Sequence, residues 1–219
     1  YYIPTIPLIL ANGSNGIGTG FSVTIPCFNP KDIKENLITL MNSKEAPSDT
    51  ILKEMTPWYK GFNGKVTKIS ENKWTTKGCY KVSRNKVMIT ELPVGTWTCS
   101  YVEYLKKLEL DSEIQRYDDY SNEVDVKITI TFGPTYITDL IKRNKLEDLL
   151  KLKTNVSATN IHVIDENGQI VKIANAEDII RRFYVIRKKA YNGRKKHLES
   201  RTTHELQILE NKIRFIKEV

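Results

Sequence analysis

The sequence predicts an α+β fold with a short N-terminal zone, a strand-rich middle and one long C-terminal helix. Apolar and polar residues alternate at 66–69, 79–82, 86–89 and 124–130, as they do in half-buried strands. From about Ala176 the apolar spacing changes to three or four residues, which is the spacing of one helix face. With 40% hydrophobic and 27% charged residues over 219 positions, the chain is expected to fold around a sizeable core.

Residues 1–45 are expected to hold an apolar entry, a glycine-rich loop and one helix. The helix start is marked by Asn29 as the capping residue and Pro30 at the first helical position, with Asp32 in the first turn. The helix is expected to bury one apolar face, made of Ile33, Leu37, Ile38 and Met41.

Residues 46–173 are expected to hold the strands, joined by tight turns and two short helices. The pattern at 161–171 predicts a hairpin with Asn167-Gly168 at its turn. Further turns are expected at Asn63-Gly64 and Arg84-Asn85, and the short helices at 100–108 and 135–144.

Residues 174–219 are expected to form a single long helix. Its stripe consists of Ile179, Phe183, Ile186, Ala190, Gly193, Leu206, Leu209, Ile213 and Ile216. Some 40 residues at 1.5 Å each would reach about 60 Å, which is long for a globular helix and typical of a coiled-coil arm. Both ends of the sequence are expected to be internal cuts, because no Met begins it and it stops within the helical pattern.

Positive charge is concentrated in the last zone. The formal net charge is +8, and residues 171–219 hold 13 Lys and Arg against 6 Asp and Glu, a net of +7. The first 170 residues therefore hold the other 21 against 20, a net of +1. A basic stripe of this kind indicates either a polyanionic partner, usually nucleic acid, or a solvated helix face, and charge alone does not separate the two.

Cysteine usage and hydropathy exclude several classes of protein. Cys27, Cys79 and Cys99 are odd in number and far apart, which argues against a disulfide framework and against a zinc cluster. Three reduced thiols in a reducing compartment are expected. No apolar run has the length that crosses a bilayer, so no membrane partner is expected.

The stretch at 6–22, Ile-Pro-Leu-Ile-Leu-Ala-Asn-Gly-Ser-Asn-Gly-Ile-Gly-Thr-Gly-Phe-Ser, is the most informative in the chain. Its density of glycine indicates backbone that lies close to something or adopts dihedral angles that favour glycine. A dinucleotide-binding loop would open directly into a helix, whereas this loop runs into extended sequence that ends at Pro26. A purely structural turn is the other interpretation of composition alone.

This stretch resembles type IIA DNA topoisomerases of the eukaryotic and large-DNA-virus kind. The bacterial gyrase branch has a similar Asn-Gly-x-x-Gly-Ile opening, but Gly18-Thr19-Gly20-Phe21 is similar to the eukaryotic branch. Three more blocks resemble that family in the same order, at 57–62 (Pro-Trp-Tyr-Lys-Gly-Phe), 90–98 (Thr-Glu-Leu-Pro-Val-Gly-Thr-Trp-Thr) and 150–154 (Leu-Lys-Leu-Lys-Thr).

The resemblance implies a fold and a function. Residues 1–45 would be the end of a winged-helix region that carries a DNA-bending loop, 46–173 an α/β tower domain, and 174–219 the truncated first helix of a coiled-coil arm. The implied function is to bind and bend gate DNA within an enzyme that passes one duplex through a transient break in another. That enzyme acts as a homodimer and needs ATP and Mg²⁺, but no cofactor is expected in this piece.

The resemblance also assigns roles to residues. Ile17 would wedge between base pairs and bend the duplex, a known use of apolar side chains; an ordinary core isoleucine is the alternative. Lys151, Lys153 and Asn155 would lie on one face of an extended chain. The remaining DNA contacts implied are Asn12, Gly13, Gly16, Lys60, Trp97, Thr154, Ser157, Thr159 and Asn160. Gly95 departs from the family, which commonly has Arg there, so the cationic contact of that arginine is not expected in this chain.

No catalytic residue is expected in this chain. The family's nucleophile is a tyrosine preceded by arginine, upstream of the glycine loop, so it would lie before Tyr1. The pair Arg116-Tyr117 falls in a different segment, and no metal-binding acids or oriented base accompany it in sequence. His162, His197 and His204 lack ligand spacing, so no metal site is expected either.

A different class of function also fits the charge and the arm. A non-enzymatic DNA-bending module with a basic helix would need no nucleophile, but it would not account for four blocks in family order. The compartment depends on the source. The nucleus is expected for a cellular enzyme, and the host cytoplasm or the virion for a viral one.

Overall fold

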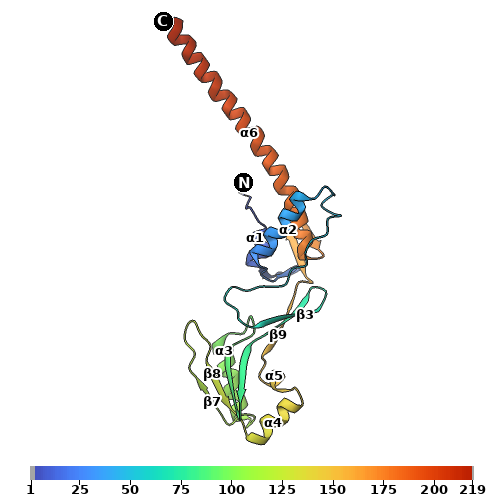
Figure 1. The fold of residues 1–219 in the computed structure, drawn as a ribbon, viewed down its shortest axis with the longest axis vertical. Coiled ribbons are helices and arrows are strands. Elements are labelled where there is room, and N and C mark those ends of the chain that lie inside the picture. The colour runs from blue at the N-terminus through green and yellow to red at the C-terminus, as the bar shows by residue number, and fades with distance from the viewer. Residues whose placement is uncertain (1–2, 219) are drawn as a thin grey trace.

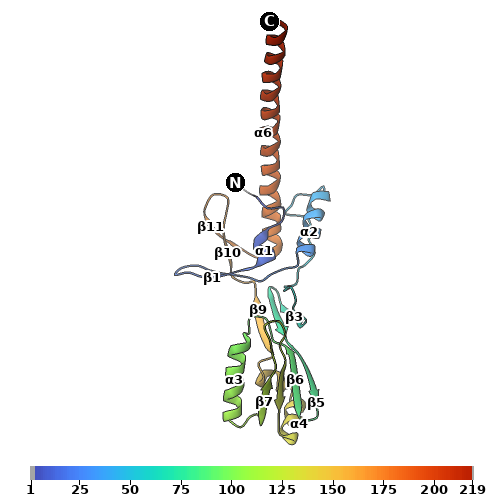
Figure 2. The same ribbon diagram turned by 90° about the vertical axis from the view of Figure 1, so that its left-hand side faces the viewer.

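The molecule is elongated, with a strand-rich body at one end and a single projecting helix at the other (Figure 1). The computed structural model describes residues 3–218. Its helix α6 (Ala176–Glu218) runs for 43 residues, about 65 Å at 1.5 Å per residue, which confirms the predicted long helix. Ile180 is the last buried residue of α6, and every described residue after Ala190 is exposed. Figure 2 shows the C-terminal part of α6 projecting away from the other elements.

Two hydrophobic clusters hold the rest together. The proximal cluster lies at the base of α6 and joins parts of the chain that are far apart in sequence. Its buried members are Leu10, Ile25, Phe28, Ile33, Leu40, Met55, Trp74, Ala158, Ile161, Ile173, Ala176, Ile179 and Ile180. The N-terminal zone and the start of the long helix therefore share one core, and the domain boundaries implied by the resemblance stay a prediction.

The proximal cluster is built by two helices and two hairpins. The helices are α1 (Leu8–Asn12) and α2 (Pro30–Asn42), beside the first turns of α6. The antiparallel hairpins are β1 (Ser14–Ile17) with β2 (Ser22–Ile25), and β10 (Ile161–Ile164) with β11 (Ile170–Ile173). The second of these confirms the hairpin that the sequence predicts.

Helix α2 begins as the sequence predicts but buries a different face. Asn29 caps it by accepting the backbone N–H of Lys31 at 3.0 Å. Of the predicted apolar face, Ile38 and Met41 are exposed, so that part of the prediction was wrong. Asn36 is buried instead, because its amide donates to the carbonyl of Lys53 at 2.9 Å and accepts the N–H of Lys53 at 2.9 Å. A tertiary pair of hydrogen bonds thus decides which side of α2 faces the core.

The distal cluster lies between a four-stranded antiparallel sheet, in the order β5-β6-β8-β7, and the helices beside it. Val87 and Ile89 of β6 and Ile128 and Ile130 of β8 are fully buried, as period-two alternation requires. The strands are β5 (Cys79–Ser83), β6 (Lys86–Glu91), β7 (Arg116–Asp119) and β8 (Ile128–Thr131), and the helices are α3 (Thr98–Leu110), α4 (Pro134–Lys142) and α5 (Leu146–Leu149).

Most predicted strands and helices of the middle zone are confirmed, but the strand predicted at 124–130 begins only at Ile128. The side chain of Asn122 accepts the N–H groups of Val124 and Asp125 at 2.8 and 2.6 Å. This local turn removes both residues from the ladder, and Val124 is left exposed.

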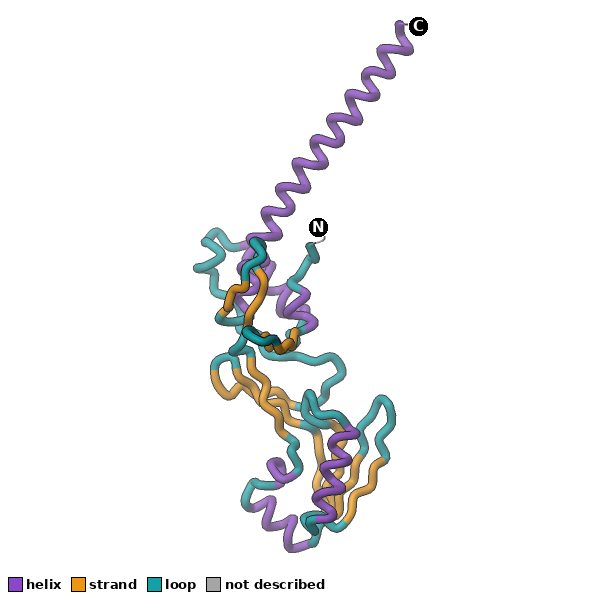
Figure 3. The backbone as a smooth tube through the Cα atoms, turned by 180° about the vertical axis from the view of Figure 1, so that it is seen from behind, coloured by secondary structure: helices purple, strands orange, loops and turns teal. Residues whose placement is uncertain are grey.

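A three-stranded antiparallel sheet, β3-β4-β9, lies between the two clusters (Figure 3). Its strands are β3 (Lys65–Ser70), β4 (Lys73–Lys77) and β9 (Lys153–Ser157). Gly78 follows β4 directly and donates its N–H to the carbonyl of Leu152 at 3.0 Å. A side chain cannot fit at Gly78, because a Cβ there would lie 2.3 Å from the carbonyl oxygen of Glu91.

Glu147 on α5 ties this sheet to the distal body. Its carboxylate accepts Lys153 Nζ at 2.6 Å, Lys77 Nζ, and the hydroxyl of Tyr80 at 2.7 Å. Burial raises the pKa of Glu147, but the hydrogen bonds from these three donors outweigh it and lower the pKa to about 2. The pKa of Tyr80 shifts in the opposite direction: burial, together with the hydrogen bond to the Glu147 carboxylate, raises it to about 12.

We expect Glu147→Gln to destabilise the fold at neutral pH. The folded-state pKa lies below the unfolded value of about 4.3, so the stabilisation is present above that value and is lost as pH falls through about 2. Unfolding by denaturant at pH 7 and at pH 3 should therefore show a larger deficit at pH 7. The exposed Glu103→Gln is the control, and an equal deficit at both pH values would contradict the assignment.

Candidate nucleic-acid interface

The hairpin of β1 and β2 holds Ile17 in solvent. Ile17 is paired in register with Ser22, and the chain turns between them with the N–H of Gly18 donating to the carbonyl of Phe21 at 3.0 Å. The side chain of Ile17 is 93% exposed, so it is not a core isoleucine. An isolated exposed apolar residue is ordinary, but one at the tip of a projecting hairpin is placed to be buried by a partner.

Two of the glycines in this loop are explained by the hairpin itself. Gly13 has φ +69°, and a Cβ there would lie 2.8 Å from the carbonyl oxygen of Ile25. Gly18 is as close, since its Cβ would lie 2.8 Å from the carbonyl oxygen of Phe21. Gly16 and Gly20 both have room for a side chain, so at these two positions the hairpin does not explain the glycine. Asn12, at the end of α1, is exposed and uses its carbonyl to accept the thiol of Cys27.

Strand β9 displays part of the predicted DNA-contacting segment. Lys153, Asn155 and Ser157 lie on one face, since alternate residues of a strand point the same way. The expectation that Lys151 shares this face was wrong. Lys151 has φ +47°, its N–H bonds the carbonyl of Asp148, and its ammonium stacks over the ring of Tyr104 at 4.0 Å.

Thr154 is also turned away from this face. It is paired with Thr76, which is fully buried, and its carbonyl accepts the Thr76 hydroxyl at 3.2 Å. Beyond the strand, Thr159 is exposed, whereas the side-chain amide of Asn160 already donates to the hydroxyl of Ser22. Of the predicted segment, Lys153, Asn155 and Ser157 therefore share the face and Thr159 is exposed beyond it, with Lys153 paired with Glu147 and Asn155 accepting from Thr75.

The structure extends this face across β3, which the sequence predicts as a strand but not as part of the interface, and β4, which sequence reasoning missed. Thr75 donates to the side chain of Asn155 at 3.0 Å, which places β4 side chains beside those of β9. The register then gives the whole face, which we call the floor: Lys65 and Thr67 on β3, Lys73, Thr75 and Lys77 on β4, and Lys153, Asn155 and Ser157 on β9. The alternation of Lys73, Thr75 and Lys77 with Trp74 and Thr76 was the available signal.

Glu147 lies at one end of the floor and bonds two of its four lysines, Lys77 and Lys153. The floor therefore keeps an excess of positive charge, with Lys65 and Lys73 exposed. A field of this sign, spread over a sheet with hydroxyl and amide groups between the lysines, suits a phosphate backbone.

Trp97 and Lys60 are the two remaining candidate contacts. Trp97 precedes the first residue of α3 and is 79% exposed, which is unusual for so large a side chain. Figure 2 shows β1 and α3 on the same side of β9. Lys60 is exposed in a turn whose segment is tied to the end of β2, because the N–H of Trp58 donates to the carbonyl of Cys27 at 2.8 Å.

The match to a known family covers the whole chain. The family model for the A-type subunit of DNA gyrase/topoisomerase IV matches residues 1–219. The chain belongs to this family. The resemblance predicted from the sequence is confirmed, and the mixed α/β fold with its long C-terminal helix is confirmed by a related solved structure.

The similar proteins are type II topoisomerases of eukaryotes. DNA topoisomerase 2 of Penicillium chrysogenum is 36% identical over 221 residues, which is 99% of this chain and 13% of that protein. DNA topoisomerase 2 of Plasmodium falciparum is 37% identical over 220 residues, 99% of this chain and 15% of that protein. The crystal structure of the Plasmodium falciparum topoisomerase II DNA-binding, cleavage and re-ligation domain has a TM-score of 0.83 and 37% identity, covering 90% of this chain and 27% of that one. The chain thus spans about one seventh of these two relatives.

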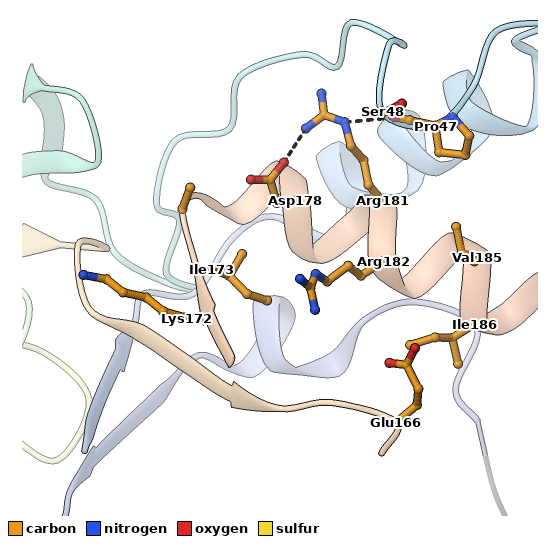
Figure 4. Close-up of a pocket in the computed structure, with 11 residues that line it drawn as sticks. Pro47, Ser48, Glu166, Lys172, Ile173, Asp178, Arg181, Arg182, Val185 and Ile186 are labelled. Atoms are coloured by element: carbon orange, nitrogen blue, oxygen red, sulfur yellow. Dashed lines mark hydrogen bonds and ion pairs between the residues drawn. The ribbon is translucent and has the colours of Figure 1, made fainter. Parts of the chain in front are cut away.

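A hollow of about 720 Å³ opens between the β10–β11 turn and α6 (Figure 4). Arg181 is committed there, since it donates to the carbonyl of Pro47 at 3.0 Å and pairs with Asp178 at 2.8 Å. Arg182 and Lys172 are opposed by Glu166 and Asp178, so the lining carries mixed charge. None of the candidate DNA contacts lines this hollow, so it is not part of the candidate interface formed by the hairpin and the floor.

Among residues 3–218, no three His, Cys, Asp or Glu side chains gather as a metal site would require. Arg116 is bound to Asp118, and Tyr117 packs against the distal cluster. No described helix has the length and apolar character needed to cross a membrane.

If the floor holds a phosphate backbone, Lys73→Ala should weaken duplex binding and make the slope of log affinity against log salt shallower by about 1. Lys68→Ala is the matched control. It removes the same charge from the same sheet, but Lys68 is paired with Trp74 on the opposite face and bound to Glu54. Equal losses in the two variants would show that the floor is not the binding face.

Proposed function

We propose that this chain binds and bends the gate DNA of an ATP-dependent type II topoisomerase. The chain belongs to the gyrase and topoisomerase IV family and is homologous to the DNA-binding and cleavage region of type II topoisomerases. The observation that carries the proposal is Ile17, 93% exposed at the tip of a hairpin beside a lysine-bearing sheet. Family membership does not favour the non-enzymatic module.

The bending step follows from two surfaces that act together. Lysines of the floor would neutralise phosphates and fix the duplex against the protein. Ile17 would then enter a base step from the groove, where an apolar wedge partly unstacks the bases and kinks the helix. Trp97, exposed at the start of α3, would add a contact along the same side.

The chemistry of strand cleavage belongs to other parts of the enzyme. The chain would contribute grip and shape, while a tyrosine elsewhere attacks the phosphate and other domains supply ATP and Mg²⁺ chemistry. The acidic donors that Mg²⁺ prefers do not gather among residues 3–218, so no metal step is assigned here. The proposed catalytic unit is a homodimer, in which α6 pairs with a returning helix through its exposed Leu206, Leu209 and Ile213 stripe.

The compartment follows from the source of the gene. We propose the nucleus for a cellular enzyme and the host cytoplasm or the virion for a viral one. The family name does not fix the compartment, since one relative, from Dictyostelium discoideum, is named as mitochondrial.

Ile17→Ala tests the wedge directly. In the intact protein, a short duplex with a fluorophore at each end should report a shorter end-to-end distance with the natural residue than with the variant. Affinity for the duplex should change much less than the bend, because the floor is untouched. Ile51→Ala is the control, since Ile51 is 89% exposed and follows Thr50, whose carbonyl accepts from Arg181 of α6. An unchanged bend in Ile17→Ala would refute the wedge.

Gly95→Arg tests the departure from the family. Gly95 has φ +83° and no atom within 4 Å of its Cβ position, so arginine would fit but would be strained. We expect tighter duplex binding with a loss of stability of about 1–2 kcal/mol, the cost of a left-handed side-chain residue. Gly95→Ala should show the same loss in thermal unfolding without tighter binding. Equal affinities in the two variants would mean that this position lies outside the interface.

A further inference from the structure

The hairpin that carries Ile17 is hydrogen-bonded on one side by residues 160–162. Ser22, the register partner of Ile17, receives two bonds from this segment. The side-chain amide of Asn160 donates to its hydroxyl, and Nδ1 of His162 lies 2.9 Å from its carbonyl oxygen. The carbonyl of Asn160 also accepts the N–H of Thr24 at 2.8 Å.

The chemistry of the Ser22 carbonyl fixes the role of His162. A carbonyl oxygen only accepts, so in this hydrogen bond Nδ1 of His162 carries a hydrogen and its N–H donates to the carbonyl of Ser22. The same ring lies against Phe21, with ring centroids 5.4 Å apart and planes tilted by 57°. His162 therefore holds both the last turn residue and the residue opposite Ile17.

We propose that His162 is a positioning residue for DNA bending, which holds the Ile17 hairpin rigid when the wedge meets a base step. This inference rests on the proposed function. A two-stranded hairpin alone is only marginally stable in water. Opening a base step costs a few kcal/mol, and an unsupported hairpin would yield before the stacked bases do.

The contacts made by residues 160–162 also fix the position of Ile17 relative to the floor. Residues 158–160 follow the end of β9 directly, so Ser157 of the floor is at most about 10 Å along the chain from Asn160. Ala158 between them is buried and donates its N–H to the carbonyl of Asn72 at 2.8 Å. DNA that lies on the floor therefore meets a wedge whose support, Asn160 and His162, follows shortly after the floor strand β9 in the chain.

Two substitutions separate the donor from the ring. His162→Phe keeps an aromatic ring against Phe21 and removes the proton donor. His162→Asn removes the ring but presents an amide N–H where Nδ1 lies. We expect duplex affinity and its salt slope to stay within about two-fold in both variants. The end-to-end shortening of a doubly labelled duplex should be lost in His162→Phe, as in Ile17→Ala, and kept in His162→Asn.

A second measurement needs no DNA and keeps the two proposals apart. Hydrogen exchange of the amides at 14–25 in the intact protein should be faster in His162→Phe and unchanged in His162→Asn and Ile17→Ala. Unchanged exchange and unchanged bending in His162→Phe would overturn the positioning role while leaving the wedge intact. Faster exchange with normal bending in both His162→Phe and Ile17→Ala would overturn the wedge and, with it, the purpose assigned to His162. A parallel fall of affinity and melting temperature in His162→Phe would indicate a purely structural histidine.

Discussion

The carboxylate of Glu147 is the constraint on which the arrangement of the floor depends. It sits on α5, in the distal body, and accepts from Lys77 and Lys153 on two strands of the floor and from Tyr80 on the first strand of the distal sheet. An unpaired charge with this little exposure would be costly, so the contact forms only when α5 and the two sheets are in place together. The orientation of the floor against the distal body is thereby set by a charged group together with Leu152, which precedes β9 and is buried in the distal cluster.

The parts of the fold that could be predicted are those whose signals are local. The capping residue Asn29 and the alternation at 86–89 depend on neighbours within a few positions, and both are confirmed. The errors arise where a partner far along the chain competes with the pattern. Asn36 takes a buried place on α2 because the backbone of Lys53 satisfies its amide, and no periodicity of apolar residues reports such a bond.

The candidate site likewise has parts that local sequence predicts and parts that depend on residues far along the chain. Four family blocks lead from the sequence to the hairpin and to β9, but Lys65 and Lys73 could not be placed beside Asn155 without knowing that β4 pairs with a strand some 80 residues later. A left-handed residue breaks the predicted run at Lys151, which turns its ammonium onto Tyr104 instead. Asn160 was assigned to DNA by resemblance, whereas its amide is used to hold the hairpin.

The free energies of burying Ile17 and of bending DNA explain why the wedge and the floor must be joined rigidly. Burying one isoleucine side chain contributes about 1.5–3 kcal/mol, whereas bending a site of 20–30 base pairs costs about 1–6 kcal/mol. The wedge alone therefore cannot meet the larger costs, and phosphate contacts on the floor must supply the difference. Those contacts can act on a base step only if the distance between floor and wedge is fixed. The segment from Ser157 through Ala158 to Asn160 fixes this distance. It begins in the floor at Ser157, and its Ala158 is buried in the proximal cluster. It ends at Asn160, whose side chain bonds Ser22, the register partner of Ile17.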